Sequence, residues 1–254
     1  MPEASHHLRE LARRPMRVAS PVRRYRPDPG RHEVDGDLIL IARGEAGPDF
    51  NFAVVVGPLP PEQVFARADA FFGGTTYAVA VEAETAQPTE EALRAAGWRL
   101  DEDEPALVLT PIPTTIPEPP AGLTIELVST EASLRDFVAL SGRAGRWTPP
   151  LAFVRDPAVA FFVGYVAGAP VAACRFIRYE DVGEITGVTT IPAFQRRGIG
   201  TALTWAACAE GARRGCVAMT LTASAMGYPV YVAMGFVPVC TIRTYLPPSA
   251  APGV

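Results

Sequence analysis

A short stretch of glycines and arginines has the pattern most typical of anion binding in this chain of 254 residues. It consists of Gln195, Arg196, Arg197, Gly198, Ile199, Gly200 and Thr201, and it lies between an expected strand and a long, alanine-rich expected helix. Glycines let the backbone approach a ligand closely, and the first turn of a helix offers N–H groups and the positive end of the helix dipole. The stretch therefore predicts a pyrophosphate cradle, although a tight strand-to-helix turn without a ligand has the same pattern.

The residue types present exclude several other kinds of site. All 23 cationic residues are arginines, so a Walker lysine or a lysine Schiff base is excluded. The three histidines lie within the first 32 residues, which argues against a Ser-His-Asp triad or a multi-histidine metal site in the main body. The four cysteines form no C-x-x-C pair and are expected to be buried thiols in a reducing compartment. No metal is expected.

A second motif begins after the expected helix and strand that follow the pyrophosphate pattern. Its residues are Ala223, Ser224, Gly227, Val230, Tyr231, Met234, Gly235 and Phe236. Together the two motifs resemble the GNAT superfamily of acyl-CoA-dependent N-acyltransferases, because loop, helix, strand, tyrosine and Gly-Phe occur in the family's order. The resemblance covers residues 123–246, roughly half of the chain, and it implies acetyl-CoA (coenzyme A) as the cofactor.

The resemblance also implies which residues hold that cofactor. Backbone amides of residues 195–200, with Thr201, would bind the pyrophosphate, and Arg196 and Arg197 would add screening charge. The strand preceding the loop would open away from its neighbour, so that its backbone holds the pantetheine arm and a backbone N–H polarises the acyl carbonyl. That strand end consists of Val188, Thr189 and Thr190. Ser224 stands where many relatives carry Asn, which leaves its hydrogen bond to the cofactor open. A solvent-exposed loop is the alternative reading of the arginine pair.

Acylation of an amine requires a proton acceptor and a proton donor. Alkyl amines have a pKa of about 10.4, so a group or a water chain must remove a proton before attack. The resemblance assigns this role to Glu184, with Glu180 and Asp181 as nearby substitutes. It assigns the protonation of the departing thiolate to Tyr231, whose phenol pKa of about 10 suits that task. An exposed strand-edge carboxylate and a core aromatic are the alternatives for Glu184 and Tyr231.

The sequence says least about the acceptor substrate. In the family fold, the segment before the expected hairpin lines the acceptor site, and here it contains Arg143, Arg146 and Trp147. The arginines suit a carboxylate or phosphate and the tryptophan a ring or cation, but a surface loop without a substrate role fits equally well. We predict acetyl transfer to a primary amine of a small molecule by direct attack in a ternary complex. An acyl-CoA sensor without turnover and a protein or peptide N-acetyltransferase are the alternatives.

The elements that would position these residues form a mixed α/β (α+β) fold. From residue 123 onward we expect a GNAT domain, with helices at 131–141, 198–214 and 228–234. Its strands are expected at 123–128, 159–167, 170–179, 182–191, 217–223 and 236–245. Residues 32–110 should form a smaller α/β accessory domain, in which Gly97-Trp98 before a strand loosely resembles the Gly-Phe of the family. We read that domain as a degenerate GNAT-like half without its own cofactor. The proline-rich residues 111–122 are expected to be a linker.

The first 31 residues are expected to be an arginine-rich tail. They hold eight arginines and three acidic residues, a balance of +5 that leaves −9 for the rest of the net −4. No amphipathic helix is evident, and a solvated tail or a segment packed on the acidic remainder is favoured over a nucleic-acid-binding arm. No apolar segment approaches the roughly 20 residues of a membrane span, so we expect a cytoplasmic enzyme without a membrane partner. A homodimer is left open.

Overall fold

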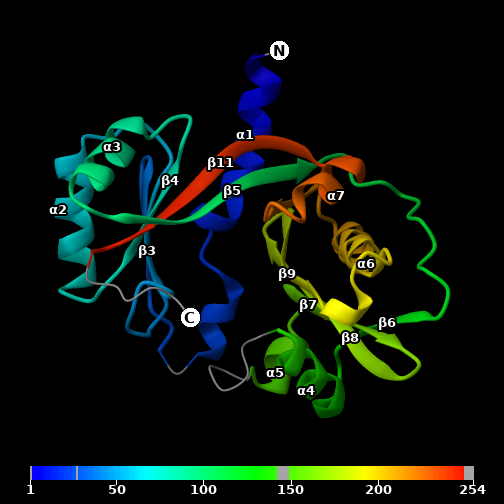
Figure 1. Cartoon of the computed structure of the whole chain (residues 1–254). Coiled ribbons are helices and arrows are strands. Elements are labelled where there is room, and N and C mark those ends of the chain that lie inside the picture. The colour runs from blue at the N-terminus through cyan, green and yellow to red at the C-terminus, as the bar shows by residue number, and fades with distance from the viewer. Residues whose placement is uncertain (1, 27, 142–148, 249–254) are drawn as a thin grey trace. The chain divides into compact units, whose positions relative to one another are not determined.

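The computed structural model describes residues 2–26, 28–141 and 149–248, which form two compact units (Figure 1). Unit 1 comprises Met1–Tyr25, Leu107–Leu221 and Gly227–Val237. Unit 2 comprises Arg26–Ala106, Thr222–Met226 and Pro238–Val254. None of the helices in the described residues has the length and apolar character of a membrane span.

Unit 1 contains five neighbouring strands in the order β10-β9-β8-β7-β6. They are β6 (Leu123–Leu127), β7 (Val159–Val166), β8 (Ala169–Tyr179), β9 (Val182–Thr190) and β10 (Ala218–Thr222). The pairs from β6 to β9 are antiparallel, whereas β9 and β10 are parallel. Parallel neighbours need a crossover connection, and α6 (Ile199–Arg213) supplies it.

Different helices cover the two faces of these strands. A Cβ added to Gly183 on β9 or to Gly211 on α6 would meet the Met219 sulfur at 2.7 or 2.5 Å, so α6 packs tightly on that face. On the opposite face lie α4 (Glu131–Leu140) and α5 (Leu151–Val154), whose Phe137 and Phe153 join strand residues in one core cluster. The alternation of side chains along β9 therefore decides which face each residue serves.

The N-terminal segment is not the tail that the sequence predicts. Residues Pro2–Arg17 form helix α1, which buries Leu11 and Ala12, and Pro21–Tyr25 form the 3₁₀ helix η1. The Tyr25 hydroxyl donates to Asp156 Oδ2 at 2.6 Å, and Arg14 Nη1 donates to Asp181 Oδ1 at 2.9 Å. No amphipathic helix was evident in this part of the sequence, whereas the structure has one that forms an ion pair with Asp181 of the same unit.

Unit 2 contains neighbouring strands in the order β1-β2-β3-β4-β11-β5. They are β1 (Arg31–Asp35), β2 (Leu38–Ala42), β3 (Asn51–Val55), β4 (Ala78–Glu82), β11 (Val237–Leu246) and β5 (Arg99–Leu109). The helices are α2 (Pro61–Phe72) and α3 (Gln87–Ala95). Strands β3 and β4 are parallel and are joined through α2, so unit 2 has its own strand–helix–strand crossover. Its core includes Val79, Leu93 and Tyr245.

The units divide the chain differently from the expected domains. Residues 111–122, expected as a linker, form neither helix nor strand and belong to unit 1. The last strand, β11, was expected in the C-terminal domain, but its residues from Pro238 onward belong to unit 2, where Tyr245 pairs with Val79 of β4. The reason is that strand pairing joins neighbours in space, so a strand distant in sequence can complete a sheet.

A buried carboxylate on α3 ties the C-terminal strand into unit 2. Glu90 is 6% exposed, and its Oε1 accepts from Tyr245 Oη at 2.7 Å, Arg94 Nη2 at 2.6 Å and Arg243 Nη1 at 3.0 Å. Burial raises the pKa of this carboxyl, but the Tyr245 hydroxyl and the two guanidiniums outweigh burial and hold the pKa below its ordinary value. The ionised form is therefore favoured by folding.

We predict that Glu90→Gln lowers the free energy of unfolding by about 1 to 3 kcal/mol at pH 7, because charge-assisted hydrogen bonds are lost. A lowered folded-state pKa contributes stability above the unfolded value of about 4.3 and loses it as the pH falls further. Thermal unfolding between pH 7 and pH 3 should therefore show a weaker pH dependence in the variant than in the wild type. Glu91→Gln, at an exposed neighbour on α3, is the matched control; equal effects of both variants would contradict the role of Glu90.

Candidate active site

Strand β9 extends beyond its pairing with β10. The parallel register joins Ala218 to Val182, Met219 to Gly183 and Thr220 to Glu184, and it covers only these three pairs. The last six residues of β9, 185–190, lie beyond that register. Their backbone groups on the β10 side are therefore outside the regular ladder.

A β-bulge interrupts the other edge of the same strand end. Ala173 pairs with Thr189 and Arg175 pairs with Thr186, so Gly187 and Val188 together face the single residue Cys174. Gly187 has a φ of +64°, a left-handed conformation that glycine adopts without steric cost. A bulge leaves one residue out of the ladder and re-aims its neighbours. Backbone groups at Val188 are thus directed differently from those of a regular strand.

The loop after β9 leads directly into the exposed start of α6. Gln195 Nε2 donates to the Thr190 carbonyl at 3.0 Å, which fastens the loop to the strand end. Gly198 caps α6 with a φ of +75° and makes no side-chain cap hydrogen bond. The first intrahelical bond here runs from Ala202 N to Gly198 O at 2.9 Å, so the N–H groups of the preceding helical residues have no acceptor within the helix.

The start of α6 lies against the bulged end of β9. A Cβ added to Gly200 would be 3.7 Å from Thr190 Oγ1 and 3.8 Å from Val188 Cγ1. Arg196 and Arg197 are exposed on the loop, and Arg197 lies over the Phe194 ring at 5.0 Å and donates to Ala193 O at 3.0 Å. Uncapped amides, a helix dipole and two guanidiniums around one small-residue turn fit a pyrophosphate.

Residues 130–236 match a family model described as "Acetyltransferase (GNAT) family". These residues form a GNAT domain. The match contains β9, the loop, α6 and α7, which are the elements that carry the resemblance in the sequence. The comparison with curated proteins gives no match.

Solved structures share this fold over more of the chain than the GNAT domain alone. A GCN5-related N-acetyltransferase from Kribbella flavida is 21% identical, covers 87% of this chain and 90% of its own, and has a TM-score of 0.68. A second one, from Sphaerobacter thermophilus, is 15% identical over 92% and 91%, with a TM-score of 0.58. A tandem GNAT protein from the clavulanic acid biosynthesis pathway is 14% identical over 82% and 77%, with a TM-score of 0.56. The predicted mixed α/β class with a GNAT fold is confirmed.

Within the GNAT domain, Glu184 is half-buried on the face of β9 that is opposite α6. It pairs in register with Ile177, which belongs to the core cluster of α4 and α5, whereas its neighbour Gly183 packs toward α6. Arg175 sits two positions away on β8 and on the same face, diagonal to Glu184. The substitutes considered from the sequence, Glu180 and Asp181, form ion pairs with Arg14 of α1, so they serve packing of that helix.

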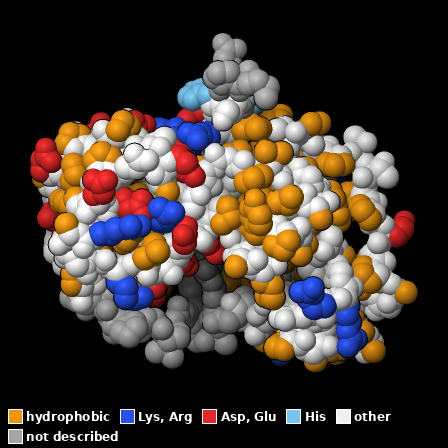
Figure 2. Space-filling view, turned by 45° about the horizontal axis from the view of Figure 1, so that its top comes forward, with side chains coloured by type: hydrophobic (Ala, Val, Ile, Leu, Met, Phe, Trp, Pro, Cys, Tyr) orange, Lys and Arg blue, Asp and Glu red, His pale blue; other side chains and the backbone are white. Residues whose placement is uncertain are grey.

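Tyr231 lies on the short helix α7 (Tyr228–Ala233) of the GNAT domain. Its ring is half-buried and meets Phe236 edge-on, with centroids 5.9 Å apart. Gly235, with a φ of +94°, follows the C-terminal end of the helix, and the Phe236 N–H donates back to Tyr231 O at 3.0 Å. Figure 2 shows hydrophobic side chains exposed on the face that it presents, and Val230 and Val232 of α7 are exposed at 38% and 42%. Tyr231 is therefore the inward tyrosine of this helix.

The remaining predicted site residues lie elsewhere. Ser224 is exposed in the segment Thr222–Met226, which belongs to unit 2. The predicted acceptor residues Arg143, Arg146 and Trp147 fall outside the described residues. Sequence reasoning did not find the bulge in β9, although a glycine inside an expected strand, Gly187, is a signal for one.

The cysteines of the GNAT domain, Cys174, Cys208 and Cys216, are free thiols and are buried. Burial raises the pKa of Cys174 above its ordinary value, that of Cys208 to about 12 and that of Cys216 to about 11. A raised pKa keeps a thiol protonated near neutral pH, and only the thiolate is a good nucleophile. These three thiols are therefore poorly suited to carry an acyl group.

Proposed function

We propose that this protein is an N-acetyltransferase that moves an acetyl group from acetyl-CoA to a primary amine of a small molecule. The observation that carries the proposal is the uncapped start of α6 against the bulged, opened end of β9 in a GNAT domain. That arrangement combines an anion cradle with strand backbone whose β10 side lies outside the regular ladder. Both are required for a long cofactor with a polyanionic end and an acyl end.

Each part of this arrangement has a role in the proposal. The amides of Gly198, Ile199, Gly200 and Thr201 hold the pyrophosphate, and the guanidiniums of Arg196 and Arg197 add positive charge to that cradle, with Gln195 fixing the loop. The backbone of Val188, Thr189 and Thr190 holds the pantetheine arm. When bound, acetyl-CoA supplies an acetyl group activated as a thioester.

Glu184 serves in this proposal as the group that accepts the amine proton, directly or through water. Its half-buried position limits solvent around the carboxylate, and its strand leads to the bulge at Gly187 and Val188. Tyr231 serves as the proton donor to the departing sulfur, because a phenol with a pKa of about 10 is protonated at neutral pH. The raised pKa values of the buried thiols support direct attack by the amine rather than an acyl-enzyme.

Unit 2 is proposed to be a GNAT-like half without its own cofactor. Its crossover β3-α2-β4 has the same parallel strand–helix–strand order as β9-α6-β10. At the start of α2, however, Pro60 and Pro61 stand where the cradle of α6 has amides. Proline has no N–H, so this helix start offers fewer backbone donors to a phosphate than the start of α6 does. The likeness to a solved protein described as a tandem GNAT protein supports this reading.

The proposal predicts turnover when the full chain is incubated with acetyl-CoA and a panel of aliphatic, aromatic and sugar amines, with unacetylated peptides as a separate arm. Thiol release should be detected with at least one small amine and should exceed release with every peptide. Binding of acetyl-CoA without turnover on any amine would instead indicate a sensor. Turnover confined to peptides would indicate a peptide N-acetyltransferase, and either result would contradict the proposal.

Glu184→Gln should lower kcat/KM by about 10²-fold near pH 7, because a glutamine amide cannot accept the proton. The loss should shrink toward pH 9 to 10, where more of the amine is already deprotonated. The measurement is the pH profile of thiol release with the best amine of the panel. Glu126→Gln, at an exposed position on β6, is the control. A loss that is constant across pH would remove the proton-acceptor role from Glu184.

Tyr231→Phe should slow the chemical step by about 10²-fold while the affinity for acetyl-CoA stays within twofold, because only the hydroxyl proton is removed. Single-turnover kinetics report the chemical step, and calorimetric titration with CoA reports the affinity. Tyr228→Phe tests the exposed tyrosine of the same helix and should leave both quantities unchanged. Equal rates in wild type and Tyr231→Phe would show that the hydroxyl takes no part.

A further inference from the structure

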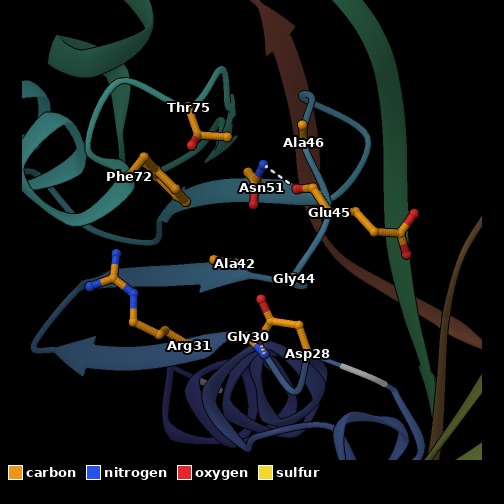
Figure 3. A pocket seen from close by; sticks show the side chains of 10 residues that line it. All are labelled: Asp28, Gly30, Arg31, Ala42, Gly44, Glu45, Ala46, Asn51, Phe72 and Thr75. Atoms are coloured by element: carbon orange, nitrogen blue, oxygen red, sulfur yellow. Dashed lines mark hydrogen bonds between the residues drawn. The ribbon is translucent and has the colours of Figure 1, made fainter.

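Unit 2 contains a cavity of about 410 Å³ that the acyl-transfer proposal does not use (Figure 3). Its lining comes from the start of β1, the end of β2, the loop before β3 and the end of α2. The lining residues include Asp28, Arg31, Ala42, Asn51, Phe72 and Thr75. The volume is within the range of small-molecule sites, and all of these residues belong to unit 2.

Asn51 gives this cavity a fixed hydrogen-bond acceptor. The residue is 2% exposed, and its Nδ2 donates to Glu45 O at 3.0 Å, Gly47 O at 3.0 Å and Thr76 O at 3.3 Å. Three carbonyl oxygens surround one end of the Asn51 amide, so that end must carry the nitrogen. In the flipped amide, Oδ1 would lie against these carbonyl oxygens without a hydrogen between them.

The other end of the Asn51 amide is available to a ligand. Among the described residues no group donates to Oδ1, and Figure 3 shows this oxygen on the side of Ala42 and Gly44, away from the bond to Glu45. An amide oxygen that faces the cavity and has no protein donor can accept a hydrogen bond from a ligand N–H. The feature therefore points to a ligand with a hydrogen-bond donor.

Two opposite charges complete the lining. Asp28 accepts from the Gly30 N–H with Oδ1 at 2.8 Å and is itself exposed. Arg31 is held with its guanidinium 4.1 Å from the centroid of the Phe71 ring. The third charged residue, Glu45, forms an ion pair with Arg26, and Figure 3 shows its carboxylate directed away from Asn51. One carboxylate and one guanidinium are thus left for a ligand.

Close backbone packing shapes the wall of the cavity. Gly30 has a φ of +65°, and a Cβ there would meet Ala42 O at 1.9 Å. Gly44 has a φ of +75°, and a Cβ there would meet Asp28 O at 2.6 Å. Only glycine fits both positions, so the segments that carry Asp28 and Ala42 are held tightly together. On the other side, the Phe72 ring stacks on Tyr77 with centroids 4.6 Å apart, which fixes an apolar surface.

We propose that this cavity binds a small zwitterion of the amino-acid class. The ammonium group donates to Asn51 Oδ1 and to the Asp28 carboxylate, and the carboxylate of the ligand pairs with the Arg31 guanidinium. The body of the ligand packs against the Phe72 ring. The inference goes beyond the proposed acetyl transfer, because it assigns a ligand to unit 2, whose function the transfer chemistry leaves open.

The first test is calorimetric titration of the full chain with each of the twenty common L-amino acids. The best binder is then compared with its decarboxylated amine and with the matching carboxylic acid that lacks the amine. The zwitterion should bind at least tenfold more tightly than either analogue, because each analogue loses one charged contact. Absence of binding by all twenty, or equal binding of an analogue, would overturn the proposal.

Charge-removing variants locate the binding. Arg31→Gln and Asp28→Asn should each weaken binding of that amino acid at least tenfold, and asparagine can still accept from the Gly30 N–H. The matched controls are Arg67→Gln and Asp35→Asn, which break an exposed ion pair of 2.6 Å in the same unit but outside the cavity. Thermal unfolding should show all four variants folded. The assignment would be overturned if Arg31→Gln and Asp28→Asn left binding unchanged, as they would if the amino acid bound at the acyl-transfer site. It would also be overturned if the control variants weakened binding equally.

Discussion

The backbone N–H groups at the start of α6 have no acceptor inside the helix, and the proposed acyl-transfer site depends on where they point. Their position is set by the crossover from β9 to β10, since a parallel pair requires the helix to begin at the end of the first strand. Gly200 allows that helix start to contact Val188 and Thr190 without a side chain between them. A side chain there would occupy the space between the anion cradle and the strand end that is proposed to hold the acyl arm.

A similar crossover occurs in unit 2, but the residues at the start of its helix are prolines and not glycines. Strand β3, helix α2 and strand β4 repeat the parallel order, but α2 begins at Pro61 after Pro60, whereas α6 begins at Ile199 after Gly198. Glycine supplies an N–H and close approach, and proline supplies neither. Two similar arrangements of secondary structure therefore differ in what they can bind, and the difference lies in two residues at the start of one helix. Unit 2 instead has its cavity at the other end of α2, around Asn51 and Phe72.

How far the sequence could predict the molecule depends on how local each feature is. Helix α6 follows from an alanine-rich segment that begins after glycine, and the short helix α7 is followed by Gly235, so both were predicted within a few residues. The pairing of β11 with β4 was not predicted, because no local pattern reveals which distant strand is the neighbour. Helix α1 was missed because Pro15 and a run of arginines mask its short apolar stripe at Leu11 and Ala12.

The residues of the candidate site also differ in how far the local sequence could predict them. The anion cradle was predictable, since amides at a helix start need only the local sequence. The surroundings of Glu184 were not, because its register partner Ile177 and the diagonal Arg175 come from another strand. Likewise, the pairing of Glu180 and Asp181 with Arg14 depends on a contact more than 160 positions apart in sequence.

The absence of lysine connects the composition to the proposed chemistry. Every cation of the chain is a guanidinium, which stays protonated and presents a planar fork of donors. Such forks serve structure here, as in the bonds of Arg94 and Arg243 to Glu90 and of Arg214 to Glu210. An ammonium side chain that lost its proton would be an amine nucleophile within the same protein. Since the chain carries no such side chain, no side-chain amine competes with the external acceptor for an activated acetyl group.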